Sequence, residues 1–424
     1  MVTWLCRIII GAVFVFSGFV KAIDPWGTLY KFDEYLAALN LPVLHTLLLT
    51  GVFGLCALEF LLGIFMVFGC YRKSAPALVL AVMCVMLPLT LWVAVKNPVS
   101  DCGCFGDAFV ISNWATFWKN VVLTAMAVWL VRFNRREPTV ISPAFQWMGV
   151  VVSLGFVLMV ALRGYLNQPM LDFRPYHIGQ PLISSHDDSD SDDNFKFIYE
   201  KNGVKKEFGV DDVLPSEEEG WKFVERVDIM PDSSEKTTGD SRTFRLWDKE
   251  GKEDVTDEVI DADRDYILVL MPDLAKVSPA MTWKINALND WAVEHKMELI
   301  AVASGTPEQI SEWEDLSMPG YDIYTCDDTA IKEVARGNPS VVWLNHGTIG
   351  WKYTLESNEL DPISSDSLNI TPDALRTDTR QILVNWVWIY LACMSVLVAV
   401  SMLPRLKGVY ERRVTHDDTA PREE

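Results

Sequence analysis

Basic residues are scarce in this sequence, and their scarcity excludes one class of function. The 424 residues include 37 lysines and arginines against 57 aspartates and glutamates, for a formal net charge of −20. A protein that binds nucleic acid places a basic stripe against the phosphate backbone, and the sequence contains no such stripe. We therefore expect no nucleic-acid partner.

Closely spaced cysteines and histidines are also rare. Only eight cysteines and six histidines occur, and the only close pair of cysteines is Cys102 and Cys104. A disulfide scaffold needs cysteines at framework spacing, and a structural zinc site needs four Cys or His ligands in suitable pairs. The sequence therefore predicts neither a disulfide framework nor a metal centre.

Long apolar runs, in contrast, are abundant. Hydrophobic residues make up 50% of the chain. They concentrate in the N-terminal part, whereas most acidic residues lie in the polar block that follows. A membrane-spanning helix requires about 20 predominantly apolar residues. Six runs meet this requirement, namely Trp4–Ala22, Thr46–Phe68, Ala75–Val95, Ala115–Phe133, Phe145–Leu162 and Leu383–Leu403.

The basic residues of the short loops indicate the orientation of these spans, because such residues favour the cytoplasmic side. Arg72 and Lys73 follow the second run, residues 132–136 close the fourth, and residues 405–413 follow the last. All of them fall on one side if both termini are cytoplasmic. We expect a multi-pass inner-membrane protein, in contact with lipid, whose residues 167–381 are periplasmic and whose residues 405–424 are a cytoplasmic tail. The first run lacks an obvious cleavage site and is expected to remain as a helix.

Between the first two runs, Trp26–Leu41 carries apolar residues at helical spacing and charges on the other face. This pattern predicts a helix that lies flat at the outer interface.

The polar block divides into two parts. Residues 167–265 are expected to form a linker and a small β subdomain. It contains a hairpin around Asn202-Gly203, which is a strong turn signal, and further strands at Trp221–Arg226 and Phe244–Trp247. Residues 266–356 alternate strands and helices, which favours a sheet covered on both faces. A polar tether, 357–381, leads to the sixth span at 382–404.

The outer loop that contains Cys102-Gly103-Cys104 is the candidate site. Two thiols one residue apart close only a small, strained disulfide ring, and a strained, exposed disulfide is easily reduced. Gly103 and Gly106 give the backbone freedom to form and release it. The alternative is that both thiols stay reduced and merely line the loop. Asp101 and Asp107 flank the pair and are expected to raise the pKa of its thiols by like charge. The alternative is that these two aspartates form a charge cluster with Lys21 and Asp24 at the mouth of the first span.

A carboxylate within a span is the second candidate. Glu59 lies in an apolar helix one turn after Cys56, and an intramembrane carboxylate marks a pathway or a partner. It is either a proton relay for thiol or quinone chemistry or a structural partner of Arg7. Three aromatic residues near the loop would flank a quinone ring or anchor the interface, namely Phe105, Trp114 and Trp118.

Three of the remaining cysteines leave alternatives open. Cys56 and Cys84 both fall near mid-membrane, where they form a second pair or behave as small hydrophobes. Cys326 is the only thiol of the outer domain, and it either belongs to the core or forms a mixed disulfide with the loop pair.

Three segments carry a resemblance to a known family. They are Ser17–Pro25 at the end of the first span, Glu59 with Gly63 in the second, and Cys102–Gly106 in the outer loop. Together they resemble the MauE/DoxX family of redox-associated membrane proteins. The resemblance implies a four-helix bundle over residues 1–137, followed by a fifth helix at 138–166, and a link to disulfide formation or electron transfer in the bacterial envelope. Five spans, an outer domain and a sixth span resemble envelope proteins of this family from Bacteroidota.

The outer domain carries a second resemblance. Its strand and helix order and Pro339, with an expected cis peptide before it, are similar to the thioredoxin fold. A thioredoxin carries CxxC where its first strand meets its helix, whereas this chain has Pro272–Pro279 without a cysteine. The resemblance therefore implies the shape of a thioredoxin without a dithiol cycle of its own.

These observations predict a mostly α membrane helix bundle with an extracytoplasmic α/β thioredoxin-like domain. The leading functional hypothesis is a thiol–disulfide oxidoreductase in which Cys102 and Cys104, with Glu59, exchange electrons between an envelope dithiol protein and a membrane carrier such as a quinone. The outer domain then holds or presents the substrate. The alternative is a non-catalytic scaffold for maturation or assembly of an envelope complex, which the missing CxxC favours. A transporter is a third and weaker hypothesis.

Overall fold

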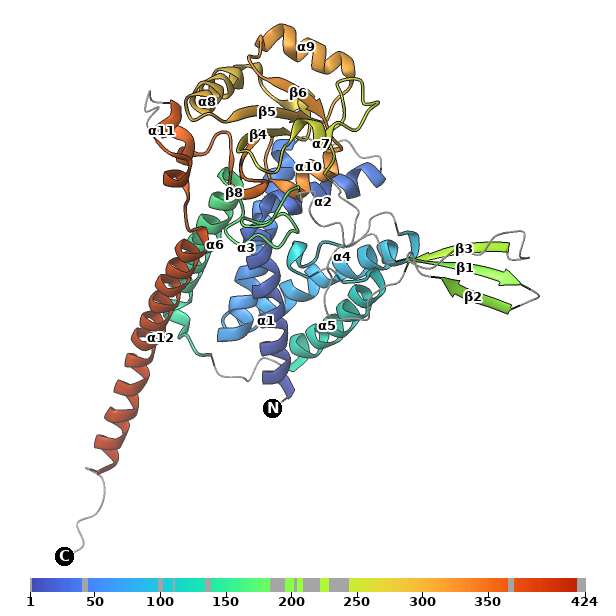
Figure 1. Ribbon diagram of the computed structural model, residues 1–424. Coiled ribbons are helices and arrows are strands. Elements are labelled where there is room, and N and C mark those ends of the chain that lie inside the picture. Colours follow the sequence, from blue (N-terminus) through green and yellow to red (C-terminus); the bar gives the residue numbers. More distant parts are fainter. Residues whose placement is uncertain are drawn as a thin grey trace, which may run out of the picture.

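The computed structural model describes residues 2–39, 45–97, 102–109, 111–133, 139–183, 195–201, 204–208, 222–228, 244–364 and 370–417. Figure 1 shows a bundle of helices with a sheet-and-helix domain at one end and a small separate sheet beside it. The N-terminal end of α1 and the C-terminal end of α12 both lie away from the sheet-and-helix domain.

Within the described ranges, six helices are long and apolar enough to cross a membrane. The six predicted spans are thereby confirmed, and the protein is a multi-span membrane protein. The helices are α1 (Val2–Ile23), α3 (His45–Phe68), α4 (Ser74–Lys96), α5 (Asn113–Phe133), α6 (Gln146–Leu166) and α12 (Thr379–Asp417). The last helix continues beyond its predicted end at Leu403.

Glycines bring α1 and α3 into close contact. A Cβ atom added at Gly63 would lie 2.4 Å from the backbone nitrogen of Val15, and one at Gly18 would lie 2.5 Å from that of Phe60. Helices in membranes use such small residues to pack backbone against backbone. The close approach fixes the register of the two helices, and with it the partners of every polar side chain between them.

A shorter helix, α2 (Pro25–Ala38), lies across the outer end of the bundle beneath the sheet-and-helix domain (Figure 1). Asp24 is its N-cap and accepts a hydrogen bond from the backbone nitrogen of Gly27 at 2.9 Å. Pro25 at the first helical position needs no partner for a backbone N–H. The structure thus contains the predicted interfacial helix, three residues shorter at its end than expected.

The small sheet has the antiparallel order β2-β1-β3, formed by β1 (Phe195–Lys201), β2 (Val204–Phe208) and β3 (Lys222–Asp228). It contains the predicted hairpin and the strand expected near Trp221. The prediction of another strand at Phe244–Trp247 was wrong. Among the described residues, Trp247 makes isolated bridges with Asp254 and Thr325 instead of a strand ladder. Phe244 and Leu246 are apolar because they are buried against the larger domain.

The larger domain is built on a five-stranded sheet of order β6-β5-β4-β7-β8. Strands β4 (Tyr266–Met271), β5 (Glu298–Ala303) and β6 (Asp322–Thr325) are parallel, whereas β7 (Ser340–Asn345) and β8 (Thr348–Thr354) continue the sheet in antiparallel fashion. The helices of the domain are α7 (Thr256–Val259), α8 (Thr282–Glu294), α9 (Pro307–Ser317), α10 (Asp328–Val334) and α11 (Asp361–Ser364).

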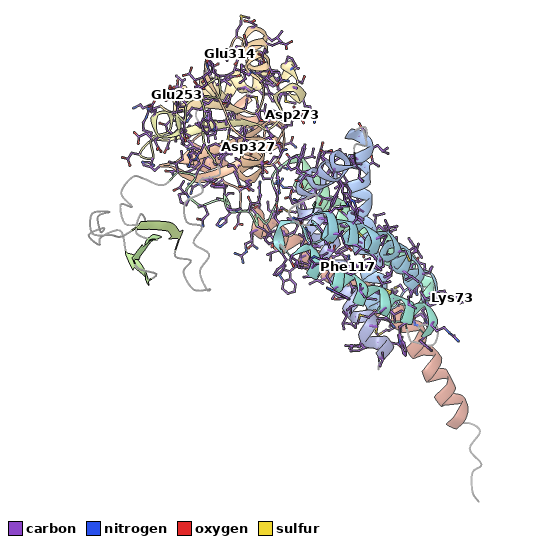
Figure 2. All side chains as sticks on the ribbon, turned by 90° about the vertical axis from the view of Figure 1, so that its right-hand side faces the viewer. Lys73, Phe117, Glu253, Asp273, Glu314 and Asp327 are labelled. Carbon is purple, nitrogen blue, oxygen red and sulfur yellow. The ribbon has the colours of Figure 1, made fainter. Side chains whose placement is uncertain are left out.

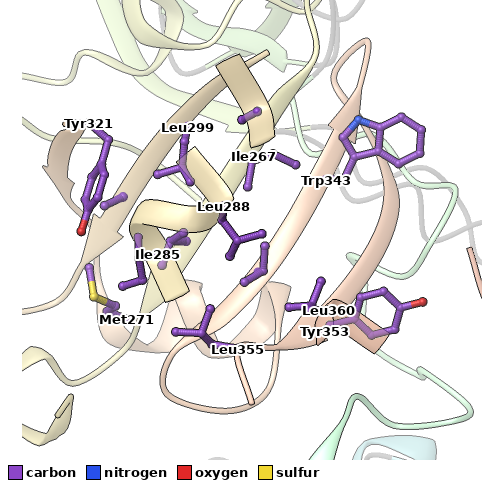
Figure 3. Close-up of a cluster of buried hydrophobic side chains, with 14 of the residues drawn as sticks. Ile267, Met271, Ile285, Leu288, Leu299, Tyr321, Trp343, Tyr353, Leu355 and Leu360 are labelled. Atoms are coloured by element: carbon purple, nitrogen blue, oxygen red, sulfur yellow. The ribbon is translucent and has the colours of Figure 1, made fainter. Parts of the chain in front are cut away.

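Both faces of this sheet are covered, as the alternating pattern predicted. Alternate residues of β4 enter two separate hydrophobic clusters. Ile267 and Met271 pack with α8 in one cluster (Figure 3), and Leu268 packs with α10 in the other. Because a strand points successive side chains to opposite faces, a fully apolar strand needs both covers. The Asn338–Pro339 peptide before β7 is cis, as expected.

Candidate functional site

Cys102 and Cys104 lie at the outer end of the bundle in a tightly turned loop. Their sulfur atoms are 2.8 Å apart, and the backbone nitrogen of Cys104 donates to Cys102 Sγ at 3.3 Å. Gly103 and Gly106 have φ angles of +62° and +52°, a left-handed conformation that glycine adopts without strain. The two glycines therefore allow the turn that brings the sulfurs together.

Side chains from α1 and α2 hold the backbone of this loop. The hydroxyl of Tyr35 donates to the carbonyl of Cys102 at 2.8 Å, and Lys21 Nζ donates to the carbonyl of Cys104 at 3.0 Å. Ser17 Oγ lies 2.7 Å from the same Cys104 carbonyl. The position of both cysteines is thus set by the helices beneath them.

Glu59 pairs with Lys21. Lys21 Nζ lies 2.7 Å from Glu59 Oε2, and only 5% and 7% of the two side chains are exposed. Ser17 Oγ is 2.8 Å from the same carboxylate oxygen, and its single proton serves either Glu59 or the Cys104 carbonyl. A buried carboxylate with an ammonium and a hydroxyl at this distance is well compensated. Glu59, Lys21 and Ser17 form one polar cluster directly below Cys104.

The sequence offered Arg7 as a structural partner of Glu59, and that expectation was wrong. Arg7 Nε donates instead to the carbonyl of Met66 at 3.2 Å. Arg7 lies 14 residues before Lys21 on α1, or about 21 Å along the helix axis. The two basic residues of α1 therefore sit at opposite ends of the bundle, and only Lys21 reaches Glu59.

The two thiols differ in their acidity. Hydrogen bonding from Cys104 is the largest influence on Cys102, and with Thr116 and the charge of Lys119 it lowers the pKa of Cys102 to about 6, against the opposing effect of burial. The hydrogen bond to Cys102 and burial raise the pKa of Cys104 well above its usual value. One thiol is therefore a thiolate at neutral pH while its neighbour remains protonated.

The expectation that flanking aspartates raise the thiol pKa was wrong for Cys102. Asp107 forms an ion pair with Arg336 of the outer domain, so its charge is compensated. Asp101 lies outside the described residues.

The three predicted aromatic residues are not brought together. Phe105 packs edge-to-face on Phe16, with ring centroids 5.4 Å apart, and Lys119 Nζ lies 4.0 Å from the centroid of its ring. Trp114 and Trp118 are 52% and 61% exposed on α5. Their exposure suits the interfacial anchoring that was the alternative reading.

Two hollows flank the sulfur pair. The larger one, about 70 Å³, extends from the pair into the bundle and is lined by α1, α2, α3, α4 and α5. The smaller one, about 10 Å³, is bordered by Phe109, Ile111 and Thr116 on the loop and the start of α5. Both cysteines line both hollows. The smaller hollow is no larger than a single water molecule needs.

Sequence reasoning had not identified all the polar groups of the larger hollow. Thr90, Lys119 and Asn120 line it from α4 and α5, beside Lys21 and Glu59 from α1 and α3. Ser17 belonged only to the family-like segment Ser17–Pro25, and Lys21 to that segment and to the expected charge cluster, so neither was predicted to contact Glu59. Their spacing of four residues, which places both on one helix face, was the available signal.

None of the remaining cysteines is among the residues that line the two hollows. Cys56 is buried and Cys84 is exposed, and all eight cysteines are free. Cys326 belongs to the core of the larger domain, where burial raises the pKa of its thiol to about 12. Such a thiol is unreactive at neutral pH.

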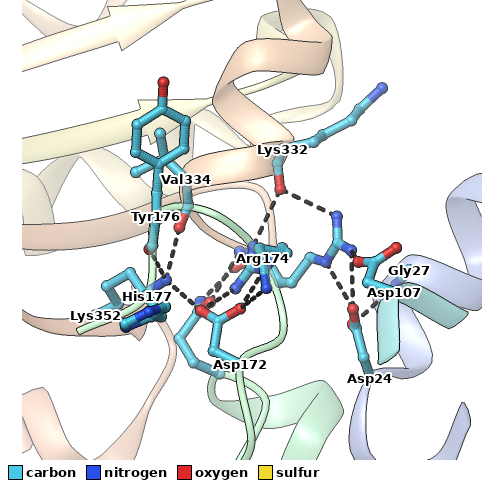
Figure 4. A network of polar contacts seen from close by, with 12 residues as sticks. Asp24, Gly27, Asp107, Asp172, Arg174, Tyr176, His177, Lys332, Val334 and Lys352 are labelled. Atoms are coloured by element: carbon cyan, nitrogen blue, oxygen red, sulfur yellow. Dashed lines mark hydrogen bonds and ion pairs between the residues drawn. The ribbon is translucent and has the colours of Figure 1, made fainter. Parts of the chain in front are cut away.

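Arg336, just before Pro339, joins the outer domain to the candidate site (Figure 4). Its guanidinium lies 2.9 Å from Asp24 Oδ2 and also pairs with Asp107, and its NH1 donates to the carbonyl of Lys332 at 3.0 Å. The Arg336 side chain is 7% exposed. A charge cluster of Lys21, Asp24, Asp101 and Asp107 had been the alternative from sequence. In the structure, Asp24 and Asp107 form ion pairs with Arg336, and Lys21 forms an ion pair with Glu59.

A second group of buried charges lies next to Arg336. Asp172 accepts hydrogen bonds from Arg174 at 2.7 and 2.8 Å and forms an ion pair with Lys352. These contacts hold the pKa of Asp172 well below its usual range even though burial opposes this. Burial and the charge of Arg174 lower the pKa of Lys352 to about 7. The segment after α6 is thereby tied to β8 (Figure 4).

The loop Pro272–Pro279, which has no cysteine, lies beside the Pro339 turn. Asn338 Nδ2 donates to the carbonyl of Asp273 at 2.7 Å. The hydrogen bond between Lys276 and Asp273 raises the pKa of Lys276, and the charge of Asp33 on α2 raises it by a smaller amount. The edge of the sheet that carries both loops therefore faces α2 and the bundle.

Fold and site together define a multi-span membrane protein with a docked α/β domain and a cysteine pair at the junction. Residues 1–133 match the family model described as "Methylamine utilisation protein MauE". The match includes Ser17, Lys21, Glu59 and the cysteine pair. Residues 194–230, which contain the small sheet, match a domain of unknown function, DUF8463. A search of curated proteins finds no match.

Proposed function

We propose that this chain is a thiol–disulfide redox protein of the inner membrane. Cys102 and Cys104 exchange electrons between a dithiol protein of the envelope and a membrane carrier. The observation that carries the proposal is the pair of sulfurs, 2.8 Å apart, on two partly exposed cysteines of one loop. Thiol–disulfide exchange requires such access to the sulfur that is attacked.

The acidity of Cys102 supports a division of labour between the thiols. Because its pKa is about 6, Cys102 is the thiolate of the reduced pair and the nucleophile when the membrane carrier reoxidises that pair. In the oxidised pair, a thiolate of the envelope protein attacks one sulfur and the other leaves. The second thiol of that protein then releases it as a disulfide, and the pair becomes a dithiol. Two electrons pass to Cys102 and Cys104 in each cycle.

Glu59 acts with Lys21 in this proposal. The two side chains, with Ser17, contact the backbone carbonyl of Cys104 or one another, so they hold the loop above the bundle. Their ion pair also places an ammonium group close to Cys104. Its positive charge favours the thiolate that each half of the cycle forms.

The outer domain is proposed to be thioredoxin-like. Support comes from the strand order β6-β5-β4-β7-β8, from the helix that follows β4, and from cis-Pro339 before β7. A thioredoxin meets its substrates at the corresponding proline loop. Here Arg336 beside that loop pairs with Asp24 and Asp107. The domain therefore orients the cysteine loop of its own chain.

We further propose that both termini are cytoplasmic and that the outer domain is periplasmic. Figure 2 supports this orientation, since Lys73 lies at the opposite end of the bundle from Glu253 and Glu314 of the outer domain. A cysteine introduced at Glu308, which is exposed, should react with a membrane-impermeant maleimide in intact spheroplasts. A cysteine at Lys73 should react only after lysis, and early labelling there would refute the topology.

The decisive experiment follows the redox state of the pair in cells by alkylation with and without prior reduction. We expect a mixture of oxidised and reduced pair in wild type. The Cys102→Ser and Cys104→Ser variants should both lose the function of the intact gene, and each should resemble the double variant. Cys393→Ser is the matched control, since Cys393 is an exposed free thiol on α12. A fully functional double variant would refute the redox proposal.

That outcome would favour a scaffold instead. The observation behind this second candidate is the junction itself, where the buried Arg336 side chain joins domain and bundle through ion pairs with Asp24 and Asp107. A scaffold requires this rigid junction and not the thiols. The Arg336→Gln variant should then lose function while the cysteine variants keep it.

A further inference from the structure

Thr116 on α5 has a buried hydroxyl beside the cysteine pair. The residue lies in the first turn of the helix and is 1% exposed. It borders the smaller hollow together with Cys102 and Cys104. That hollow, of about 10 Å³, has room for one water molecule at most. The hydroxyl therefore lies against the sulfur pair and away from bulk solvent.

This hydroxyl departs from the other helix threonines of the bundle. A threonine within a helix commonly donates its hydroxyl to the carbonyl four residues earlier. Thr50, Thr90 and Thr124 do so at 2.8, 2.9 and 2.7 Å. The backbone nitrogen of Thr116 donates to the carbonyl of Ser112 at 3.0 Å. Its Oγ1, however, has no partner of good hydrogen-bond geometry among the described residues. A buried hydroxyl without such a partner is unfavourable, so its presence needs a reason.

An anionic sulfur at Cys102 supplies that reason. The Thr116 hydroxyl is close enough to Cys102 to help lower the pKa of that thiol, and it is not among the main groups that act on Cys104. A hydrogen bond to a charged acceptor is stronger than one to a neutral acceptor. Because a hydroxyl hydrogen rotates to suit its surroundings, it turns toward the sulfur when the thiolate forms.

Lys119 follows Thr116 by three residues, so both project from one face of α5. Lys119 Nζ lies 4.0 Å from the centroid of the Phe105 ring, and its charge lowers the pKa of both thiols. The helix therefore acts on the pair with a charge and with a hydroxyl. The charge favours ionisation of either sulfur, whereas the hydroxyl favours that of Cys102.

We propose that Thr116 is a positioning residue whose hydroxyl stabilises the Cys102 thiolate and thereby makes the cysteine pair a stronger oxidant of its envelope partner. This inference rests on the proposed redox function and adds a residue to it. Whatever stabilises the reduced form of a cysteine pair makes its disulfide easier to reduce.

The step that Thr116 favours balances in bonds, electrons and protons. The S–S bond between Cys102 and Cys104 breaks, and one forms between the two sulfurs of the envelope dithiol. Two electrons pass to the pair. Of the two protons of the envelope dithiol, Cys104 takes one and water takes the other, because Cys102 remains a thiolate.

The test compares the full-length wild type with Thr116→Val, which replaces the hydroxyl by a methyl group of nearly the same size. Iodoacetamide alkylation of Cys102 in the reduced, detergent-solubilised protein is followed from pH 5 to 9, and the label is located by tandem mass spectrometry. The midpoint should rise by about one pH unit, the size of one hydrogen bond to a charged group. The variant should then react about twofold more slowly at pH 6 and about 2.5-fold faster at pH 8, because the more basic thiolate is the better nucleophile. A structural disturbance alone does not reverse sign with pH.

Matched variants keep the test specific. Thr116→Ser retains the hydroxyl and should keep the wild-type midpoint. Thr116→Ala removes the hydroxyl without adding volume and should reproduce the shift of Thr116→Val. Thr124→Val removes a hydroxyl from the same helix that is bonded to the Asn120 carbonyl at 2.7 Å, and it should leave the midpoint unchanged.

A second measurement follows the equilibrium of the pair with glutathione at pH 7. Loss of the thiolate stabilisation should raise the ratio of disulfide to dithiol in Thr116→Val about fivefold at a fixed glutathione ratio. A wild-type midpoint or a wild-type glutathione equilibrium in Thr116→Val would overturn the inference and leave the redox function standing. A fully functional Cys102 and Cys104 double variant would overturn the redox function and leave only the contact between Thr116 and the thiolate.

Discussion

The low pKa of Cys102 is tested most directly by replacing its neighbour. Hydrogen bonding from Cys104 is the largest cause of the lowered pKa, so Cys104→Ala should return the Cys102 pKa from about 6 toward its ordinary 9.0. At pH 7 a thiol with a pKa of 6 is roughly 90% thiolate, whereas one with a pKa of 9 is about 1% thiolate.

The expected change in rate is smaller than the change in thiolate fraction. Thiolate nucleophilicity falls with pKa, with a Brønsted coefficient of about 0.45. A thiolate whose pKa is lower by three units is therefore roughly 20-fold less reactive, and this loss offsets part of the roughly 90-fold gain in thiolate fraction. Wild type should therefore react about 4-fold faster than Cys104→Ala at pH 7 if the pKa returns fully. Above about pH 7.7 the order should reverse, because the variant then has more than about 5% thiolate and that thiolate is roughly 20-fold more reactive.

The assay is alkylation by iodoacetamide from pH 5 to 10 after reduction, with Cys102 followed in its own peptide by mass spectrometry. Wild type should show a midpoint near 6 and the variant a higher one. A wild-type midpoint near 9, or profiles of the two proteins that superimpose, would refute the argument from the Cys104 hydrogen bond.

Three further predictions concern stability. Gly63→Ala should destabilise the bundle by about 1–3 kcal/mol in thermal unfolding, because its Cβ overlaps α1, whereas Gly54→Ala on the same helix has nothing within 4 Å and should be neutral. Arg336→Gln should cost about 3 kcal/mol because it removes the cation that faces the largely buried Asp24 and the partly exposed Asp107, and the exposed Arg264→Gln should cost almost nothing; equal losses would contradict the role of Arg336 in joining the domain to the bundle. Lys352 binds its proton less tightly when folded, with a pKa of about 7 against 10.5, so stability should rise with pH between about 7 and 10. Lys352→Met should remove that slope.

Much of the fold was predictable because its signals are local. The six spans follow from runs of apolar residues, and the antiparallel pairing of β1 with β2 follows from the Asn-Gly turn signal between them in the sequence. The cysteine pair was equally visible, since both residues lie in one loop. Phe244–Trp247 was mistaken for a strand because burial against a distant core produces the same apolar pattern as strand pairing.

The partners of the charged residues were not predictable in the same way. Glu59 finds Lys21 because glycines at 18 and 63 set how α1 meets α3, and that register is a property of two helices together. Arg336 lies 312 residues after Asp24 in the sequence, so no spacing rule connects them. The low pKa of Cys102 depends on the geometry between neighbouring thiols, which composition does not reveal.

The outer domain is covalently attached to the membrane at both ends, since it begins after α6 and ends at α12. Its association with the bundle is therefore intramolecular, and tethering of this kind raises the effective concentration of two surfaces to the millimolar range. Even a weak junction stays closed most of the time. Opening it requires the loss of the Arg336 contacts together with those that Arg163 and Asn167 make to Glu359 and Ser357, and the domain then stays within reach and closes again. The ion pairs of Arg336 with Asp24 and Asp107 thus hold the cysteine loop reversibly. Their strength sets how often the loop is exposed to a partner.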